Sequence, residues 1–86
     1  MVPKVVQIEI YSRPGCHLCD EAKEVIERVR QRHPFSVSEI NVESDPALER
    51  EYGTDIPVIL LNGRQVFKHR VNERELEKKV KEVWNT

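Results

Sequence analysis

The sequence predicts an α/β fold, a sandwich in which helices cover both faces of a four-stranded mixed sheet. Two observations lead to this expectation. Hydrophobic residues recur with strand and helix periods in the order βαβαββα, which opens with a βαβ unit whose strands are parallel. An Asn62-Gly63 dipeptide between the last two strand patterns marks an antiparallel hairpin, because the tight turn needs positive φ angles. Residues 1–86 are expected to form one domain.

The first strand and the first helix are separated by a short turn. Apolar and polar residues alternate over residues 5–11, with the β-branched content typical of a strand. Pro14 and Gly15 then interrupt the strand. Over residues 16–32 the apolar residues return at helical spacing, and the charged residues face the other way. Pro34 ends this helix, because the residue before a proline avoids the helical region.

The second strand is expected over residues 35–42, where the hydrophobic pattern changes phase. Phe35 and Val37 alternate with polar residues, and so do Ile40 and Val42, but the second pair is displaced by one position. A bulge or an early end of the strand would explain the displacement.

A short helix and the hairpin follow. Asp45 is a typical N-cap with a proline behind it, and Gly53 is expected to close the helix at its C′ position. Residues 57–61 are apolar on both faces, which indicates a central strand. After the tight turn, residues 64–68 form the fourth strand.

The last helix is expected to begin after Asn72, whose side chain caps it. Leu76, Val80, Val83 and Trp84 share one helical face. We therefore expect these four residues to be buried, with the Trp84 ring as a lid on the core.

Composition argues against two classes of partner. The net charge is -1 and the sequence pI is near 6.3, so nothing here predicts nucleic-acid binding, which needs clustered positive charge. The longest apolar run covers only residues 58–61, too short for a membrane span, and the N-terminus lacks the apolar stretch of a signal peptide. We therefore expect a cytoplasmic protein without a membrane partner, and we treat it as a monomer.

The two cysteines carry the predicted chemistry. Cys16 and Cys19 are the only cysteines, and their spacing brings both sulfurs within the first turn of a helix. The free N–H groups and the helix dipole there stabilise a thiolate, which is the nucleophile of disulfide exchange. We predict that Cys16 is the exposed attacking thiol and Cys19 the shielded resolving thiol. Arg13 and His17 could add positive charge beside the attacking sulfur.

A proline at the start of a central strand is the second functional signal. Pro57 cannot donate to the sheet ladder, so its position is unusual. A cis Ile56-Pro57 bond would turn the backbone of Ile56 outward at the strand edge. That backbone could then pair with an extended substrate lying across the cysteines. The alternative is a trans proline that only opens the strand.

Three segments together resemble one family. Residues 11–19 are similar to the active-site segment of the glutaredoxins, within the thioredoxin superfamily, and Ile56-Pro57 with residues 61–63 resembles their cis-proline loop and hairpin. The resemblance extends over residues 4–84, and the Cys-His-Leu-Cys motif is similar to a less characterised glutaredoxin-like group. It implies a thioredoxin-like fold, dithiol activity and substrate pairing.

The resemblance also fixes the expected site and its partners. Cys16 and Cys19 would be the redox pair, with Ile56, Pro57 and Arg13 as substrate-binding residues. The substrate would be a disulfide in a protein or a small molecule, and a thiol reductant or a reductase would supply electrons. Glutaredoxins usually hold glutathione with a Gly-Gly pair and an acidic pair, but the corresponding region here contains no glycine. Glutathione is therefore one possible electron donor, and no bound cofactor is expected.

Two other functions stay open. A metal-binding module is one, because two thiolates suit Cu(I) and His17 could assist zinc. Copper chaperones of this length have a different element order, however, and structural zinc normally needs four ligands. The other is a non-catalytic interaction domain that keeps the fold.

Overall fold

A computed structural model describes residues 6–84 of the chain. The bounds of its elements are β1 Gln7–Ser12, α1 His17–Arg32, β2 Ser36–Asn41, the 3-10 helix η1 Val42–Ser44, α2 Pro46–Tyr52, β3 Val58–Leu61, β4 Arg64–Lys68 and α3 Glu73–Trp84. The predicted order of strands and helices is confirmed, with the short helix η1 as an addition. Within residues 6–84, each helix is too short or too polar to cross a membrane.

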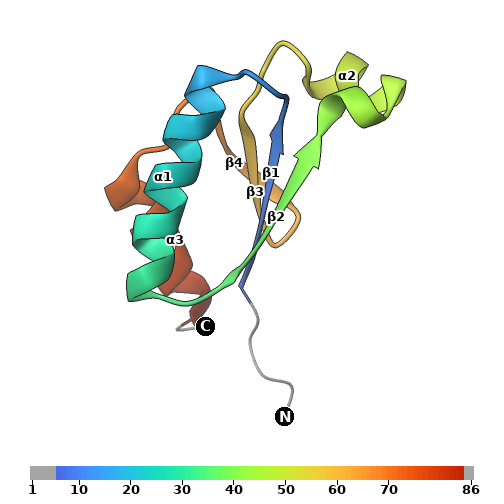
Figure 1. Cartoon of the computed structure of the whole chain (residues 1–86). Helices are drawn as coiled ribbons and strands as arrows, with labels where there is room; N and C mark the ends of the chain where they lie inside the picture. Colours follow the sequence, from blue (N-terminus) through green and yellow to red (C-terminus); the bar gives the residue numbers. More distant parts are fainter. Residues whose placement is uncertain (1–5, 85–86) are drawn as a thin grey trace.

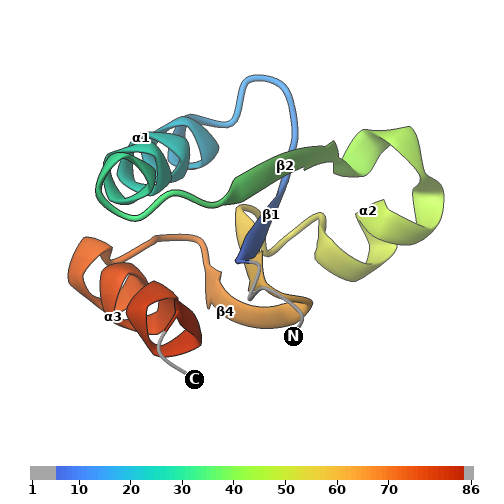
Figure 2. The ribbon, with the colours of Figure 1, turned by 90° about the horizontal axis from the view of Figure 1, so that it is seen from below.

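The four strands form one sheet in the order β2-β1-β3-β4 (Figure 1). β1 runs parallel to β2 and antiparallel to β3, and β4 is antiparallel to β3. α1 and α3 lie together on one side of the sheet, and α2 lies on the other side (Figure 2). The Tyr52 ring of α2 stacks on Tyr11 of β1, with 4.4 Å between the ring centres. The sheet is thus mixed, as predicted.

The hydrophobic core lies between the sheet and the layer of α1 and α3. Alternate residues of β1 point into it, and α1 and α3 contribute one buried stripe each. Burying one Leu, Ile or Val side chain contributes about 1.5–3 kcal/mol relative to leaving it exposed. This packing holds α1 against β1, and so it positions the loop that joins them. The buried members are Val6, Ile8, Ile10, Ala22, Ile26, Val29, Phe35, Ile59, Leu61, Leu76 and Val80.

β2 ends at Asn41, earlier than predicted, and the phase change itself lies inside the strand, where Val37 and Ile40 point to opposite faces of the sheet. β2 pairs with β1 in an unbroken register from Ser36 to Asn41, so it contains no bulge. The chain then turns into η1, which buries Val42 completely. Val37 is 38% exposed, because β2 is an edge strand that the helices cover only in part.

Trp84 lies outside the core, so the predicted lid is wrong. Its side chain is 44% exposed, whereas Leu76 and Val80 are fully buried. At 3.6 residues per turn, a residue eight positions after Leu76 is rotated about 80° away from it. Val83 lies closer to the direction of Leu76 and packs against the core in part. The buried stripe of α3 therefore passes beside Trp84.

Gly53 ends α2, as predicted, and its backbone is in the right-handed helical region. Its φ is -55° and its ψ is -32°, and its N–H donates to the Glu49 carbonyl at 2.8 Å. The glycine is explained instead by the lack of room for a side chain at this position. A Cβ atom would collide with the Glu49 carbonyl oxygen and come within 3.0 Å of Arg13 Nη2. Gly53 therefore lets α2 approach the loop between β1 and α1.

The predicted caps and the tight turn are confirmed. The Asp45 side chain accepts a hydrogen bond from the Ala47 N–H at 2.9 Å. The Asn72 side chain accepts one from the Glu75 N–H, also at 2.9 Å. In the hairpin, φ is 50° at the asparagine and 85° at the glycine, as a two-residue turn of this kind requires.

Candidate active site

The loop between β1 and α1 places Cys16 at the start of a helix. β1 ends at Ser12, and Gly15 then turns the chain with a φ of +76°, where a side chain would be strained. Cys16 is the N-cap residue of α1, with an extended backbone at φ -85° and ψ 108°. The first helical turn therefore begins directly at this cysteine.

The Cys16 sulfur occupies the place of a capping group. It accepts a hydrogen bond from the Cys19 N–H, with 3.1 Å between sulfur and nitrogen. The first N–H groups of a helix have no partner inside it, and with the helix dipole they stabilise negative charge at this position. When the cysteines are reduced, we expect this environment to lower the pKa of the Cys16 thiol below that of a free cysteine.

Cys16 and Cys19 form a disulfide, and their Cα atoms are 5.2 Å apart. The two sulfurs differ in access. Cys16 is partly exposed, whereas Cys19 is 1% exposed. The helix explains the difference, because Cys19 lies on the buried face of α1 with Ala22 and Ile26. A substrate can therefore approach only the first cysteine directly.

The segment that leads into β3 lies at the same end of the sheet as the loop between β1 and α1 (Figure 1), and Ile56 and Pro57 are its last two residues. Val58, the first residue of β3, pairs with Tyr11 near the end of β1. The Ile56-Pro57 peptide bond is cis, and the Pro57 carbonyl accepts a hydrogen bond from the His69 N–H at 2.8 Å. Within residues 6–84, no hydrogen bond involves the Ile56 backbone. Its N–H and carbonyl are thus available to another molecule.

Arg13 is directed toward α2. Its Nη2 donates to the Gly53 carbonyl at 3.1 Å and lies 3.5 Å from the Glu49 carboxylate. Its Nε is buried and has no hydrogen-bond partner in the described part of the chain. The guanidinium thus connects the cysteine loop to the C-terminal end of α2. A contact between Arg13 and a substrate stays a prediction.

A polar network beneath the cysteine loop was not predicted from the sequence. The Glu39 carboxylate accepts hydrogen bonds from Lys23 Nζ and from Ser12 Oγ, both at 2.9 Å. The Lys23 hydrogen bond is the main reason that the pKa of Glu39 lies below its usual value, and the same bond raises the pKa of Lys23. These side chains line a hollow of about 440 Å³ together with Pro14 and Gly15.

One signal in the sequence could have located this network. Ser12 shares the alternation of Ile8 and Ile10, and it is 3% exposed. A hydroxyl at a buried position needs a hydrogen-bond partner. Nothing local indicates that the partner is Glu39, because that contact spans 27 positions of the chain.

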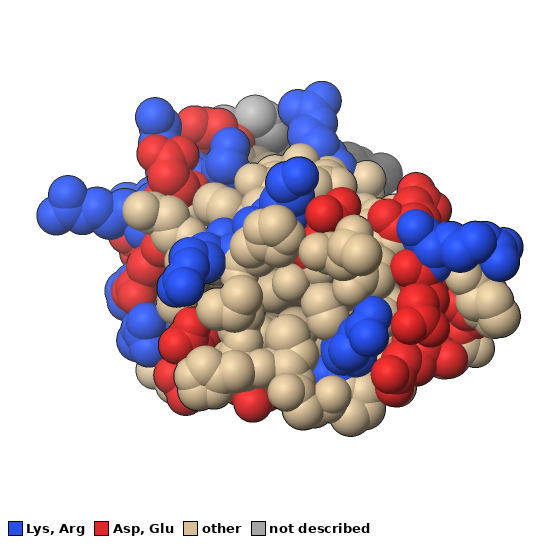
Figure 3. Space-filling view, turned by 90° about the horizontal axis from the view of Figure 1, so that it is seen from above, with Lys and Arg blue, Asp and Glu red and all other residues tan. Residues whose placement is uncertain are grey.

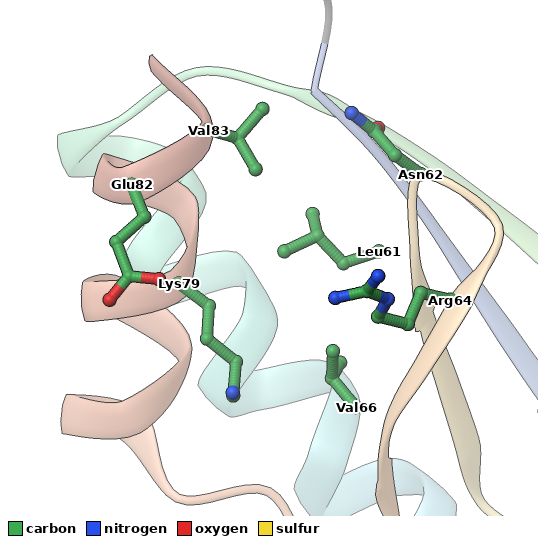
Figure 4. A pocket seen from close by; sticks show the side chains of 7 residues that line it. All are labelled: Leu61, Asn62, Arg64, Val66, Lys79, Glu82 and Val83. Carbon is green, nitrogen blue, oxygen red and sulfur yellow. The ribbon is translucent and has the colours of Figure 1, made fainter. Parts of the chain in front are cut away.

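Another hollow of about 400 Å³ lies between the β3–β4 hairpin and α3, away from the cysteine loop (Figure 4). Leu61 and Val66 give it an apolar floor, and Arg64 reaches toward Lys79 of α3 across its opening. The hairpin lies at the opposite end of the sheet from the loop between β1 and α1 (Figure 1). This hollow therefore takes no part in the cysteine site.

The metal-binding alternative would require ligands beyond the two sulfurs. In the part of the chain that the structure describes, no three His, Cys, Asp or Glu side chains gather where they could hold a metal ion. His17, the candidate third ligand, is 87% exposed, and its Nε2 lies 3.6 Å from the Glu21 carboxylate.

The fold and the cysteine pair define the class of protein. A four-stranded mixed sheet is packed against helices, and the helix after its first strand begins at a Cys-x-x-Cys disulfide. This arrangement is that of the thioredoxin superfamily, and it supports a redox role for the two cysteines.

Comparison with known proteins identifies the family. The chain belongs to the glutaredoxin-like family, because residues 7–81 match the Glutaredoxin-like domain (DUF836). It is 34% identical over 79 residues to the glutaredoxin-like protein YDR286C homolog of Dictyostelium discoideum. This alignment covers 85% of this chain and 73% of that protein. It is also 38% identical over 65 residues to the thioredoxin of Methanocaldococcus jannaschii. That alignment covers 72% of this chain and 76% of the thioredoxin.

Solved structures agree with this assignment. Protein XcR50 of X. campestris superposes with a TM-score of 0.73 at 28% identity, over 87% of this chain and 96% of that chain. The thioredoxin of Halobacterium salinarum shares the fold, with a TM-score of 0.64 at 23% identity over 91% of this chain and 74% of that chain. The predicted family and fold are therefore confirmed.

Proposed function

We propose that this protein is a thiol–disulfide oxidoreductase that works by dithiol exchange through Cys16 and Cys19. The observation that carries the proposal is the position of the Cys16 sulfur. It is accessible at the start of α1 and accepts a hydrogen bond from the Cys19 N–H at 3.1 Å, while the second sulfur is buried behind it. One cysteine can thus attack, and the other can complete the exchange.

The reaction starts from the reduced protein. The Cys16 thiolate attacks one sulfur of a substrate disulfide, a new S–S bond forms, and the other substrate sulfur leaves as a thiolate that takes up a proton. Cys19 then loses its proton and attacks the Cys16 sulfur. The second substrate thiol leaves, and the Cys16–Cys19 disulfide remains. The substrate has gained two electrons, and the protein has lost two.

Ile56 is proposed to position the substrate. Its free backbone N–H and carbonyl lie beside Pro57 at the end of the sheet that carries Cys16. An extended peptide can pair with such a free backbone edge through main-chain hydrogen bonds. Those bonds would align a cystine of the substrate across the attacking sulfur.

A thiol or a dithiol must return the protein to the reduced state. Glutathione or a reductase enzyme would supply these electrons, and the reaction needs no bound cofactor. We propose a cytoplasmic location, where thiols are kept reduced.

Reduction of insulin disulfides by dithiothreitol tests the proposal. The wild-type protein should accelerate the reaction, and Cys16→Ser should show no acceleration, because it lacks the attacking sulfur. Glu24→Gln, an exposed change on the same helix, serves as the control for handling and folding. Equal rates for the wild type and Cys16→Ser would overturn the proposal.

Trapping the intermediate tests the order of the two cysteines. In Cys19→Ser the first attack can occur, but the resolving sulfur is missing, so the mixed disulfide should accumulate. Intact mass spectrometry should then show one substrate molecule bound through Cys16. An adduct that forms equally well with Cys16→Ser would reverse the assigned roles.

A further inference from the structure

A small pocket lies beside the cysteine site, between α1 and the segment that follows β4. Leu18, Ala22 and Val25 contribute to it from α1, and Val71 contributes from the facing segment. Leu18, Val25 and Val71 are only partly buried. The pocket therefore presents apolar walls to the surrounding solvent.

The rim of this pocket carries charges that neutralise one another. The Glu21 carboxylate lies 3.9 Å from Arg70 Nη1 and 3.6 Å from His17 Nε2. The pocket thus combines an apolar interior with a rim whose acid and base already face each other. A charged group entering it would have to compete with this pair and leave water.

The size of the pocket suits one side chain. Its volume is about 170 Å³. A cavity of about 150 Å³ lined by apolar residues is enough to hold benzene. The pocket can therefore take a side chain as large as leucine or phenylalanine, and it is too small for a whole tripeptide.

The pocket borders both elements that the proposed reaction uses. Leu18 is two residues after Cys16 in the first turn of α1. On the other side, His69 lines the pocket and its N–H bonds the Pro57 carbonyl at 2.8 Å. A peptide that lies across Cys16 and pairs with Ile56 would therefore pass next to the opening.

The surrounding face is also largely uncharged (Figure 3). Seen from the end that carries the cysteine loop, uncharged side chains fill most of the middle, and charges of both signs stand around them. Other charges near the site are paired within the chain, such as Arg13 with Glu49 at 3.5 Å and His69 with Asp55 at 3.9 Å. The face therefore lacks a field of one sign that would select a charged substrate.

From these observations we infer that the pocket is a specificity site that takes an apolar side chain of an extended polypeptide substrate, next to the cysteine that Cys16 attacks. This inference rests on the proposed oxidoreductase function and names its substrate class. It favours protein disulfides with uncharged neighbours over glutathione disulfide, whose carboxylates would meet an Arg70 that is already paired with Glu21.

A series of matched peptide disulfides tests the inference. Each substrate is the symmetric disulfide of a short peptide that has one cysteine and blocked ends. In each peptide, one of the two residues that flank the cysteine is Leu, Ala, Glu or Lys. The reduced full-length protein reacts with each in a single exchange that leaves the Cys16–Cys19 disulfide, and the second-order rate constant is measured from the peptide thiol released. At the position that enters the pocket, Leu should exceed Ala by about tenfold, since the extra apolar surface is buried. Glu, Lys and glutathione disulfide should react more slowly than Ala.

Charge changes at the rim give a second test. Removing the acid and removing the base should shift the preference between the Glu and Lys peptides in opposite directions. Glu21→Gln leaves Arg70 unpaired, so it should raise the rate of the Glu peptide about threefold relative to the Lys peptide. Arg70→Gln should shift the preference the other way, and the double variant should restore the original selectivity. Glu24→Gln and Arg74→Gln make the same charge changes at exposed residues without an ion pair in residues 6–84, and they should leave selectivity unchanged.

The outcomes separate this inference from the function on which it rests. If the protein reduces every peptide but Leu gives no advantage over Ala at any position, the specificity site is refuted and the oxidoreductase function stands. Faster reaction of glutathione disulfide than of the Leu peptide would also refute it. If no disulfide is reduced at all, the proposed function fails, and the substrate class fails with it.

Discussion

Replacing Gly53 by alanine should destabilise the protein, although its backbone conformation alone predicts the opposite. At φ -55° and ψ -32°, alanine is allowed and would stabilise by about 0.4–1 kcal/mol through the unfolded state. Here the new Cβ would meet the Glu49 carbonyl oxygen and Arg13 Nη2, and such overpacking costs about 1–3 kcal/mol. The displaced Arg13 would also lose most of its hydrogen bond to the Gly53 carbonyl, worth about 1 kcal/mol. The net loss should be about 1–3 kcal/mol.

Urea denaturation of Gly53→Ala and of the wild type measures this difference. For a domain of this size, each kcal/mol corresponds to a fall in Tm of about 4–8 °C. If Arg13 is part of the obstacle, Gly53→Ala should cost less in an Arg13→Ala background, because neighbouring changes are not additive. A Gly53→Ala protein as stable as the wild type, or more stable, would refute the steric reasoning.

Three further predictions concern stability. Leu76→Ala should cost about 2–5 kcal/mol in urea denaturation, because this side chain is fully buried. Trp84→Ala should cost less than Leu76→Ala in the same assay, and a larger loss would contradict the exposed position of the ring. Hydrogen bonds from Arg32 lower the pKa of Glu73 and of Glu77. Such carboxylates stabilise the fold above their unfolded pKa and lose this effect as the pH falls through the folded one, so stability should decline below about pH 4.5. Between pH 7 and pH 3, the urea concentration at the unfolding midpoint should fall less in the double variant Glu73→Gln/Glu77→Gln than in the wild type. An equal fall in both proteins would argue against a contribution from the ion pairs with Arg32.

The parts of the fold that short-range patterns determine could be predicted from the sequence. The alternation in β1, the helical spacing in α1 and the Asn62-Gly63 turn all act within a few residues, and each is found in the structure. Predictions failed where tertiary contacts decide. Trp84 continues an apolar stripe, but among residues 6–84 nothing buries its ring, which is 44% exposed. The role of Gly53 as the end of α2 could be predicted, but its contact with Arg13 could not, because Arg13 is 40 positions away in the chain.

In the candidate site too, the local features could be predicted from the sequence, whereas the tertiary contacts could not. The Cys-x-x-Cys spacing predicted the cysteine pair at the start of α1, because this signal is local, and the proposed contact of Ile56 with a substrate stays a prediction. The hydrogen bond of the Arg13 guanidinium to the Gly53 carbonyl at the end of α2 is a tertiary contact that the sequence did not indicate. The pocket next to Cys16 could not be predicted, because residues 69–71 come from a segment that begins 37 positions after α1 ends at Arg32.

The Lys23–Glu39 pair also has a consequence for how molecules of this protein behave toward one another. β2 and β4 are the two margins of the sheet, where a strand from a neighbouring molecule could add on. Glu39 lies in the middle of β2, and β4 begins and ends with the cations Arg64 and Lys68. An incoming strand would have to remove these charges from water, which disfavours fibril growth by sheet extension. The Glu39 carboxylate accepts the hydrogen bond of the buried Ser12 hydroxyl, and it therefore also hinders polymerisation through this edge of the sheet.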